Sequence, residues 1–143
     1  MKKTIKKTII DYFSKKPEVA AVYLYGSYAR GEANINSDID LAILVTNKKK
    51  YSGFGIPQVV FAAELKKLTG KEVEIQDLGV CRVDFAHRVL AEGELLISNN
   101  QKARIQFEEK TLRVYFDLKP ALDEYYQYLS KITKKGELHV RYI

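Results

Sequence analysis

The sequence has 143 residues, of which 46% are hydrophobic and 29% are charged, a composition typical of an ordinary globular protein that forms one domain with a real core. It contains no apolar run of the ~20 residues that a membrane-spanning helix requires, and its single cysteine, Cys81, excludes an internal disulfide. The formal net charge of +6 comes from lysines in short, scattered clusters, which favour a solvated surface, so direct nucleic-acid binding is not expected.

The N-terminal segment is predicted to be a helix that Pro17 ends, because Ile5, Ile9 and Phe13 recur at helical spacing. The segment is basic, but charges interrupt its apolar part and no small-residue cleavage site follows, which argues against a signal peptide. We therefore expect a cytoplasmic protein that does not associate with a membrane.

Two strands are predicted next. An unbroken apolar and aromatic run at residues 19–25 favours a strand covered on both faces, and Gly26 then permits a tight turn. The second strand is predicted at 38–45, where a period of two places Asp38 and Asp40 on one face, together with Ala42 and Leu44. The opposite face of this strand takes Ile39, Leu41, Ile43 and Val45.

Helices and strands alternate in the rest of the chain. After a loop at 47–55, the patterns predict a helix from Pro57 to Gly70, a strand at 73–76, a short helix from Asp84 to Gly93 and a strand at 94–97. A helical pattern then begins at Asn99 or Asn100 and continues to about Thr133, and Pro120 predicts a kink or a break within it. No clear pattern follows Gly136.

The C-terminal helical segment is rich in tyrosine. We expect one face of it to pack on the sheet and another to present exposed aromatic side chains to a partner protein. We predict a single domain over residues 1–143, with a core at 1–98 and the C-terminal helical segment 99–143 packed on it. The tyrosines concerned are Tyr115, Tyr125, Tyr126 and Tyr128.

The aspartates of the second strand form a predicted metal site. Residues two apart on a strand point the same way, with Cα atoms ~6.5 to 7 Å apart, so Asp38 and Asp40 can converge on ions above one face. Two neighbouring carboxylates in an apolar strand repel unless they are protonated or bridged by cations. Magnesium prefers carboxylate oxygen and shares its other positions with phosphate and water.

The turn after the first strand forms a predicted phosphate site. Gly26 and Ser27 could start a short helix, whose backbone N–H groups and serine hydroxyl favour phosphate oxygens. Arg30 adds a forked positive donor, and Gly31 and Ser37 fit the bend that returns the chain to the second strand. The turn and the two aspartates together predict a site that binds a triphosphate and two metal ions and catalyses phosphoryl transfer.

These residues carry a resemblance to a known family. Gly26-Ser27, ten residues and Asp38-x-Asp40 resemble the signature of the DNA polymerase beta-like nucleotidyltransferase superfamily. The longer stretch GSYARGEANINSDIDLAIL is similar to the minimal nucleotidyltransferases, the MNT proteins, which are paired with HEPN-domain partners in prokaryotes. VEIQDL falls where that family has its third strand, while FAHRVLAEGELL and YFDLKPALDEYYQYL resemble its next helix and its closing helix.

The resemblance implies an α+β fold with a mixed sheet flanked by helices. It implies ATP as substrate, two Mg²⁺ ions, and transfer of AMP to a hydroxyl with release of pyrophosphate. For the HEPN-paired branch it implies an antitoxin that neutralises a HEPN ribonuclease toxin by transferring AMP to a tyrosine near the ribonuclease site, and it allows a hetero-oligomer with that toxin.

The resemblance also implies roles for individual residues. Glu74 would be the third carboxylate, although the family usually has aspartate there, and its other interpretation is a solvated strand residue. Asp77 is a fallback, but it should point to the opposite face of the strand. Asp38, Asp40 and Glu74 are thus the predicted catalytic residues and metal ligands, and Gly26, Ser27, Arg30 and Ser37 the predicted nucleotide-binding residues.

Three other hypotheses remain open. The chain could be a non-catalytic antitoxin that binds its partner through the long C-terminal helix. It could transfer a nucleotide to a small hydroxylated molecule such as an aminoglycoside, although the chain is short for a separate acceptor domain. An RNA-binding module would rest on the basic charge alone.

Overall fold

The computed structural model describes residues 3–34, 36–46 and 56–134, and within these ranges helices and strands alternate along the chain. The predictions for the loop at 47–55 and for the tail after Gly136 lie outside the described residues. The elements are α1 (Lys3–Ser14), β1 (Val19–Tyr25), β2 (Ile39–Val45), α2 (Pro57–Thr69), β3 (Val73–Asp77), α3 (Val83–Glu92), β4 (Glu94–Ser98) and α4 (Gln101–Lys134).

The strands form one mixed sheet in the order β3-β2-β1-β4. β1 runs antiparallel to both of its neighbours, and β2 runs parallel to β3. As a central strand with helices on both sides, β1 is buried along almost its whole length, as its unbroken apolar run predicted. The expected α+β fold with a mixed sheet is confirmed.

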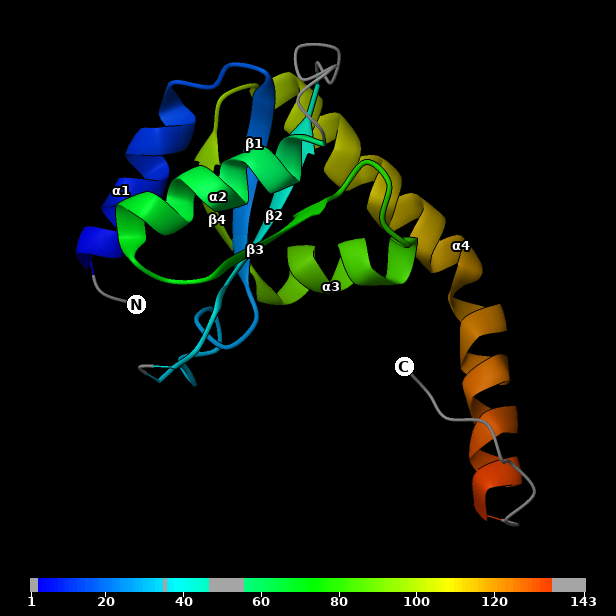
Figure 1. Ribbon diagram of the computed structural model, residues 1–143. Helices are drawn as coiled ribbons and strands as arrows, with labels where there is room; N and C mark the ends of the chain where they lie inside the picture. The colour runs from blue at the N-terminus through cyan, green and yellow to red at the C-terminus, as the bar shows by residue number, and fades with distance from the viewer. Residues whose placement is uncertain (1–2, 35, 47–55, 135–143) are drawn as a thin grey trace.

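Helices cover both faces of the sheet (Figure 1). On one face, α1 and α2 pack against the sheet through buried side chains such as Phe13 and Phe61. On the other face, α3 and the first half of α4 pack through Val89 and Phe107. The alternation predicted for β2 is confirmed, because Ile39, Leu41, Ile43 and Val45 belong to the first core, whereas Ala42 and Leu44 belong to the second.

The helix boundaries follow the predicted signals. Pro57 occupies the first turn of α2, and Gly70 ends that helix with φ of +72°. Gly93 ends α3, and the Oδ1 of Asn100 accepts a hydrogen bond from the N–H of Ala103 at 3.1 Å, so Asn100 is the N-cap of α4.

α4 is one continuous helix that contains Pro120, and Figure 1 shows its axis changing direction between the gold and the orange halves. The predicted kink is therefore observed, and a break is not. The first half is fixed to the sheet, because the Tyr23 hydroxyl donates to Glu108 Oε1 at 2.5 Å. The second half extends beyond the sheet, with Tyr125 55% and Tyr128 61% exposed, so among the described residues of the segment only the first half of α4 packs on the core.

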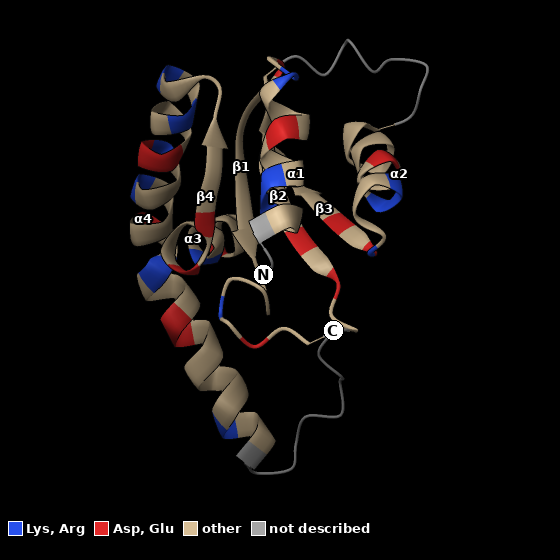
Figure 2. Cartoon of the chain, turned by 90° about the vertical axis from the view of Figure 1, so that its left-hand side faces the viewer, with Lys and Arg blue, Asp and Glu red and all other residues tan. Residues whose placement is uncertain are grey.

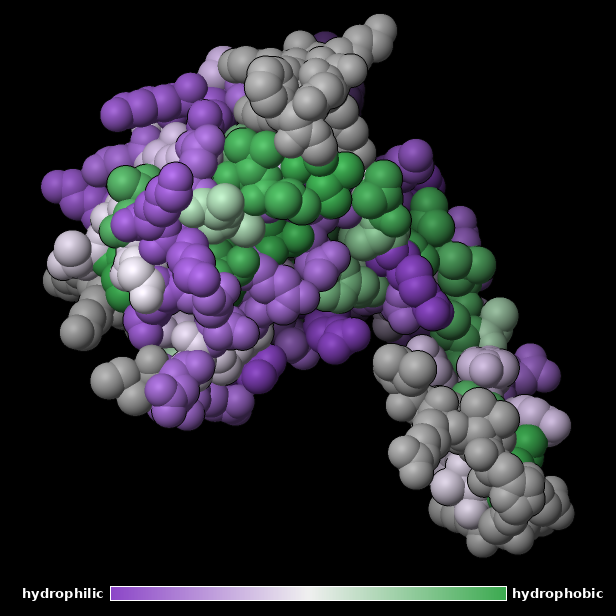
Figure 3. Space-filling view, in the orientation of Figure 1, coloured by the Kyte–Doolittle hydropathy of each residue, from purple (hydrophilic) through white to green (hydrophobic). Residues whose placement is uncertain are grey.

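Apolar side chains are also exposed away from α4. Figure 3 shows an apolar area over the start of α2 and the loop after β3, where Ile56, Val59 and Val80 are exposed. None of the helices in the described ranges is long and apolar enough to cross a membrane.

Candidate functional site

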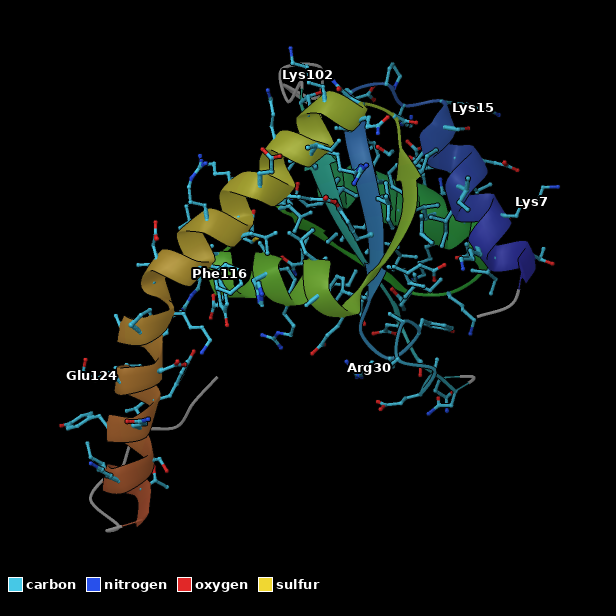
Figure 4. The ribbon with its side chains drawn as sticks, turned by 180° about the vertical axis from the view of Figure 1, so that it is seen from behind. Lys7, Lys15, Arg30, Lys102, Phe116 and Glu124 are labelled. Atoms are coloured by element: carbon cyan, nitrogen blue, oxygen red, sulfur yellow. The ribbon has the colours of Figure 1, made fainter. Side chains whose placement is uncertain are left out.

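The predicted site lies at one end of the sheet, where β1 ends and β2 begins. The loop that joins them lies below the sheet in Figure 1, and Figure 4 places Arg30 on this loop. The surface around this end is largely hydrophilic in Figure 3. The candidate functional residues therefore gather at an open, solvated edge of the sheet.

The turn that begins at Gly26 is a series of tight turns and not the short helix that was expected. Arg30 N–H donates to the Gly26 carbonyl at 3.1 Å, and Glu32 N–H donates to the Ser27 carbonyl at 2.9 Å. Gly31 then adopts φ of +72°, a left-handed conformation that reverses the chain toward β2.

Gly26 is required at its position by two independent features. Its φ is +75°, which L side chains rarely adopt. A Cβ atom added there would lie 2.2 Å from Oδ2 of Asp40, far inside van der Waals contact. The turn is therefore pressed directly against one of the predicted metal-binding carboxylates.

The acidic side chains lie in a row across the sheet. Asp40 of β2 is paired with Tyr25 of β1 on one side and with Glu74 of β3 on the other. Figure 2 shows acidic segments side by side at the starts of β2 and β3. Paired residues of neighbouring strands project from the same face, so Glu74 stands beside Asp40.

The acidic neighbours of Asp40 affect its ionisation. Burial raises the pKa of the Asp40 carboxyl, and the negative charges of Glu74 and Asp38 raise it further. The guanidinium of Arg30 acts in the opposite direction. Asp40 is thus a carboxylate whose charge is costly unless a cation neutralises it.

The alternative third carboxylate, Asp77, is excluded by its position. It pairs with Ile43, is buried on the opposite side of the sheet from Glu74, and its Oδ1 accepts a hydrogen bond from Gly79 N–H at 2.8 Å. Glu74 is exposed, and its Oε1 accepts a hydrogen bond from Gln76 Nε2 at 3.3 Å. Only Glu74 can turn toward Asp40 without leaving a buried position.

The fit of these residues to magnesium rests on the donor set. Within the described ranges, no three acidic, histidine or cysteine side chains are arranged to enclose a metal ion as they stand. Magnesium, however, is usually held by one or two carboxylates together with substrate phosphates and water, and not by a closed protein cage. Asp38 and Asp40, beside the turn at Gly26, suit that open kind of site.

Arg30 and Ser37 make contacts that brace the loop itself. Arg30 Nε donates to Glu32 Oε2 at 3.0 Å, an exposed ion pair. Ser37 Oγ accepts a hydrogen bond from Asn34 N–H at 2.9 Å, and its carbonyl accepts one from the Tyr28 hydroxyl at 3.4 Å. The ion pair uses only the Nε of Arg30, so the terminal N–H groups of its guanidinium can still donate to a phosphate. Ser37 acts here as a loop-forming residue.

Tyr25 belongs to the site but was not singled out by the sequence. Its ring packs edge-to-face on Phe85 of α3, with ring centroids 5.4 Å apart. Burial raises the pKa of the Tyr25 phenol well above its ordinary value, and the charges of Asp40 and Glu74 add to this effect. The signal available in the sequence was a tyrosine directly before Gly26, where a purely apolar residue would complete the strand equally well.

Comparisons with known proteins identify related chains. Residues 7–102 match the family model described as "Polymerase beta, Nucleotidyltransferase". A protein adenylyltransferase MntA of Shewanella oneidensis is 28% identical over 99 residues, covering 69% of this chain and 68% of that protein. A chain from a crystal structure of a toxin-antitoxin with AMP-PNP superposes with a TM-score of 0.72 at 25% identity, over 87% of this chain and 98% of that chain.

A further solved structure shares the fold. It contains a tri-AMPylated Shewanella oneidensis HEPN toxin in complex with MNT antitoxin, and the matching chain has a TM-score of 0.69 at 22% identity. The match covers 91% of this chain and 99% of that one, so the long helix after the sheet is part of the shared architecture.

Proposed function

This chain belongs to the polymerase beta family of nucleotidyltransferases, and we propose that it is a protein adenylyltransferase that transfers AMP from ATP to a hydroxyl of a HEPN-type toxin. The modified hydroxyl is that of a tyrosine near the ribonuclease site, and the transfer makes this chain the antitoxin of the pair. The name of the MntA relative and the AMPylated toxin in the related complex support this substrate class.

One observation carries the proposal. Asp40 is in register with Glu74 on one side, and the Gly26 turn closes on its carboxylate on the other. A phosphate-binding turn and a pair of carboxylates on neighbouring strands are the parts that phosphoryl transfer needs, because this chemistry depends on positioning and charge stabilisation.

Each side of Asp40 has its own task in this proposal. The turn at Gly26 and Ser27 holds the triphosphate through backbone N–H groups. The acceptor hydroxyl approaches from the open side, where Glu74 is exposed and can take its proton. The hydroxyl oxygen forms a bond to the α-phosphorus, the bond from that phosphorus to the bridging oxygen breaks, and pyrophosphate leaves.

Magnesium is the cation that the donor set suits. Asp38 and Asp40 would hold it, with Glu74 as a further ligand once its side chain turns from Gln76. When bound, magnesium supplies positive charge that stabilises the transferring phosphoryl group and the leaving pyrophosphate. The residues of the chain orient the nucleotide so that its α-phosphorus faces the acceptor hydroxyl.

The test is transfer of label from α-labelled ATP to a purified HEPN-domain toxin, with Mg²⁺ present; a toxin encoded next to the gene of this chain is the one to use. We expect label on the HEPN protein and loss of its ribonuclease activity. If the wild-type chain never labels that protein, the proposed acceptor is wrong. Label on an aminoglycoside in the absence of any protein partner would instead favour a small-molecule substrate.

Glu74→Gln should separate catalysis from nucleotide binding. The amide keeps the size of the side chain but cannot accept a proton, so we expect transfer at saturating ATP to fall by about a hundredfold. Affinity for AMP-PNP should change little, because Glu74 lies away from the turn. Glu72→Gln, two residues earlier and paired with Lys66, is the matched control and should leave the rate unchanged. An unchanged rate in Glu74→Gln would make Glu74 a solvated strand residue.

A second candidate function is binding without transfer, and the exposed half of α4 favours it. Apolar side chains recur there in alternating steps of four and three, a spacing that forms a seam for another helix. We assign this seam to the HEPN-type toxin, because the related chain that shares the long helix is in complex with such a toxin. The seam residues are Leu118, Leu122, Tyr125, Leu129 and Ile132.

Tyr125→Ala should weaken binding of the toxin. Tyrosine is a frequent anchor of interfaces, and losing one costs about tenfold or more in affinity. Glu124→Ala, on another side of the same helix, is the matched control and should bind as the wild type does (Figure 4). Affinity can be measured by titration calorimetry with the toxin. If the wild type, Tyr125→Ala and Glu124→Ala bind the toxin with equal affinity, the toxin binds another surface of the chain.

A further inference from the structure

Tyr25 completes the row of side chains across the site, and its hydroxyl has no task in the function proposed above. It is paired with Asp40 in an antiparallel ladder, so the two Cβ atoms lie ~4.5 to 5.5 Å apart on the same face. A phenol is longer than an aspartate side chain. Its hydroxyl can therefore stand farther from the sheet than the Asp40 carboxylate, at the level of atoms bound above that carboxylate.

The surroundings of Asp40 differ between the side of Glu74 and the side of Tyr25. On the Glu74 side the surface is open. On the Tyr25 side the chain continues directly into Gly26, where the turn approaches Asp40 so closely that a Cβ atom would lie 2.2 Å from Oδ2. The Tyr25 side chain therefore lies next to the turn, and next to the triphosphate that the turn holds in the proposed function.

The ring of Tyr25 is held while its hydroxyl is left available. The edge-to-face contact with Phe85 fixes the ring, with 87° between the ring planes. Among the described residues, the Tyr25 hydroxyl makes no hydrogen bond, and no buried side-chain oxygen lacks a partner, so this hydroxyl is in contact with solvent. Tyr23, two residues earlier on the same face, differs because its hydroxyl donates to Glu108.

We propose that Tyr25 positions the nucleotide, its phenolic hydroxyl donating a hydrogen bond to an oxygen of the triphosphate held by the Gly26 turn. This inference rests on the proposed function. Phosphate oxygens only accept hydrogen bonds, and a bond from a hydroxyl to a charged acceptor is shorter and stronger than one between neutral groups. Because Phe85 restrains the ring, the hydroxyl is oriented before the nucleotide arrives, so little conformational entropy is lost on binding.

The test is Tyr25→Phe, which removes the hydroxyl and keeps the ring on Phe85. Binding of AMP-PNP in the presence of Mg²⁺ is measured by titration calorimetry, and inorganic tripolyphosphate is used to compete for the same site. We expect both ligands to bind about tenfold more weakly to the variant, with no change in melting temperature. Tyr12→Phe is the matched control, because its hydroxyl donates to Glu64 on the opposite side of the sheet. Its affinity should match the wild type.

Two outcomes would overturn the inference alone. One is equal affinity of Tyr25→Phe and wild type for AMP-PNP. The other is weaker AMP-PNP binding with unchanged competition by tripolyphosphate, which would place the hydroxyl on the nucleoside. A wild-type chain that binds no AMP-PNP would overturn this inference and the proposed function together, whereas binding without transfer to the HEPN protein would overturn only the proposed function.

Discussion

Asp40→Asn is expected to abolish AMP transfer while making the metal-free protein more stable. Asp40 is the centre of the acidic row, with Glu74 beside it and the Gly26 turn against it. An amide is a poor ligand for magnesium, so the transferring phosphoryl group loses several kcal/mol of charge stabilisation, which is a rate loss of about a thousandfold or more. The measurement is the initial rate of label transfer from ATP.

The gain in stability follows from the raised pKa of Asp40, which burial and the charges of Glu74 and Asp38 produce. A carboxyl whose folded-state pKa is raised keeps its proton longer in the folded chain than in the unfolded one. Stability therefore falls as pH rises through the window between the ordinary value of about 3.9 and the raised pKa. The amide in Asp40→Asn carries no charge, so the variant avoids this loss at neutral pH.

The pH dependence and the metal dependence of unfolding test this account. Without Mg²⁺, the Asp40→Asn variant should melt at a higher temperature than the wild type at neutral pH, and the difference should disappear below about pH 4. Added Mg²⁺ should raise the melting temperature of the wild type and not of the variant. Asp11→Asn makes the same chemical change on α1 and should alter neither property. If the Asp40→Asn variant still gains stability from Mg²⁺, Asp40 is not a ligand of the metal.

Gly26→Ala is expected to reduce transfer by about a hundredfold and to lower stability. Alanine at a φ of +75° is strained, and its Cβ atom would meet Asp40 Oδ2 at 2.2 Å. The turn and the carboxylate must separate to relieve the clash. In the proposed function both act on the same nucleotide, so a displacement of about 1 Å is enough for a rate loss of this size.

Gly70→Ala provides a control that isolates the clash from the strain. Gly70 has almost the same backbone conformation, with φ of +72°, but a Cβ atom there would have nothing within 4 Å. This variant should lose about 1–2 kcal/mol of unfolding free energy from strain alone and keep its full transfer rate. Transfer rates and denaturant unfolding of both variants make the comparison. If the two variants lose activity equally, contact between the turn and Asp40 is not what matters at Gly26.

Local patterns were enough to predict the parts of this protein that depend on neighbours in the chain. The period of two in β2 predicted which side chains share the face of Asp40, and proline and glycine predicted the ends of α2. The motif Gly26-Ser27 and Asp38-x-Asp40 predicted a turn and two aspartates at one site, and the structure adds the direct contact between the turn and Asp40. These features follow from backbone geometry within a few residues, so a single sequence contains them.

Contacts between segments that are far apart in the sequence could not be predicted from local patterns. Glu74 is beside Asp40, and Asp77 is not, because β3 pairs with β2 in one particular register. Tyr25 joins the site because β1 lies on the other side of β2, and the far half of α4 is exposed because it extends past the sheet. Many registers and helix positions satisfy the same apolar pattern. The packing of the whole chain selects one of them, since that arrangement buries both faces of the sheet at once.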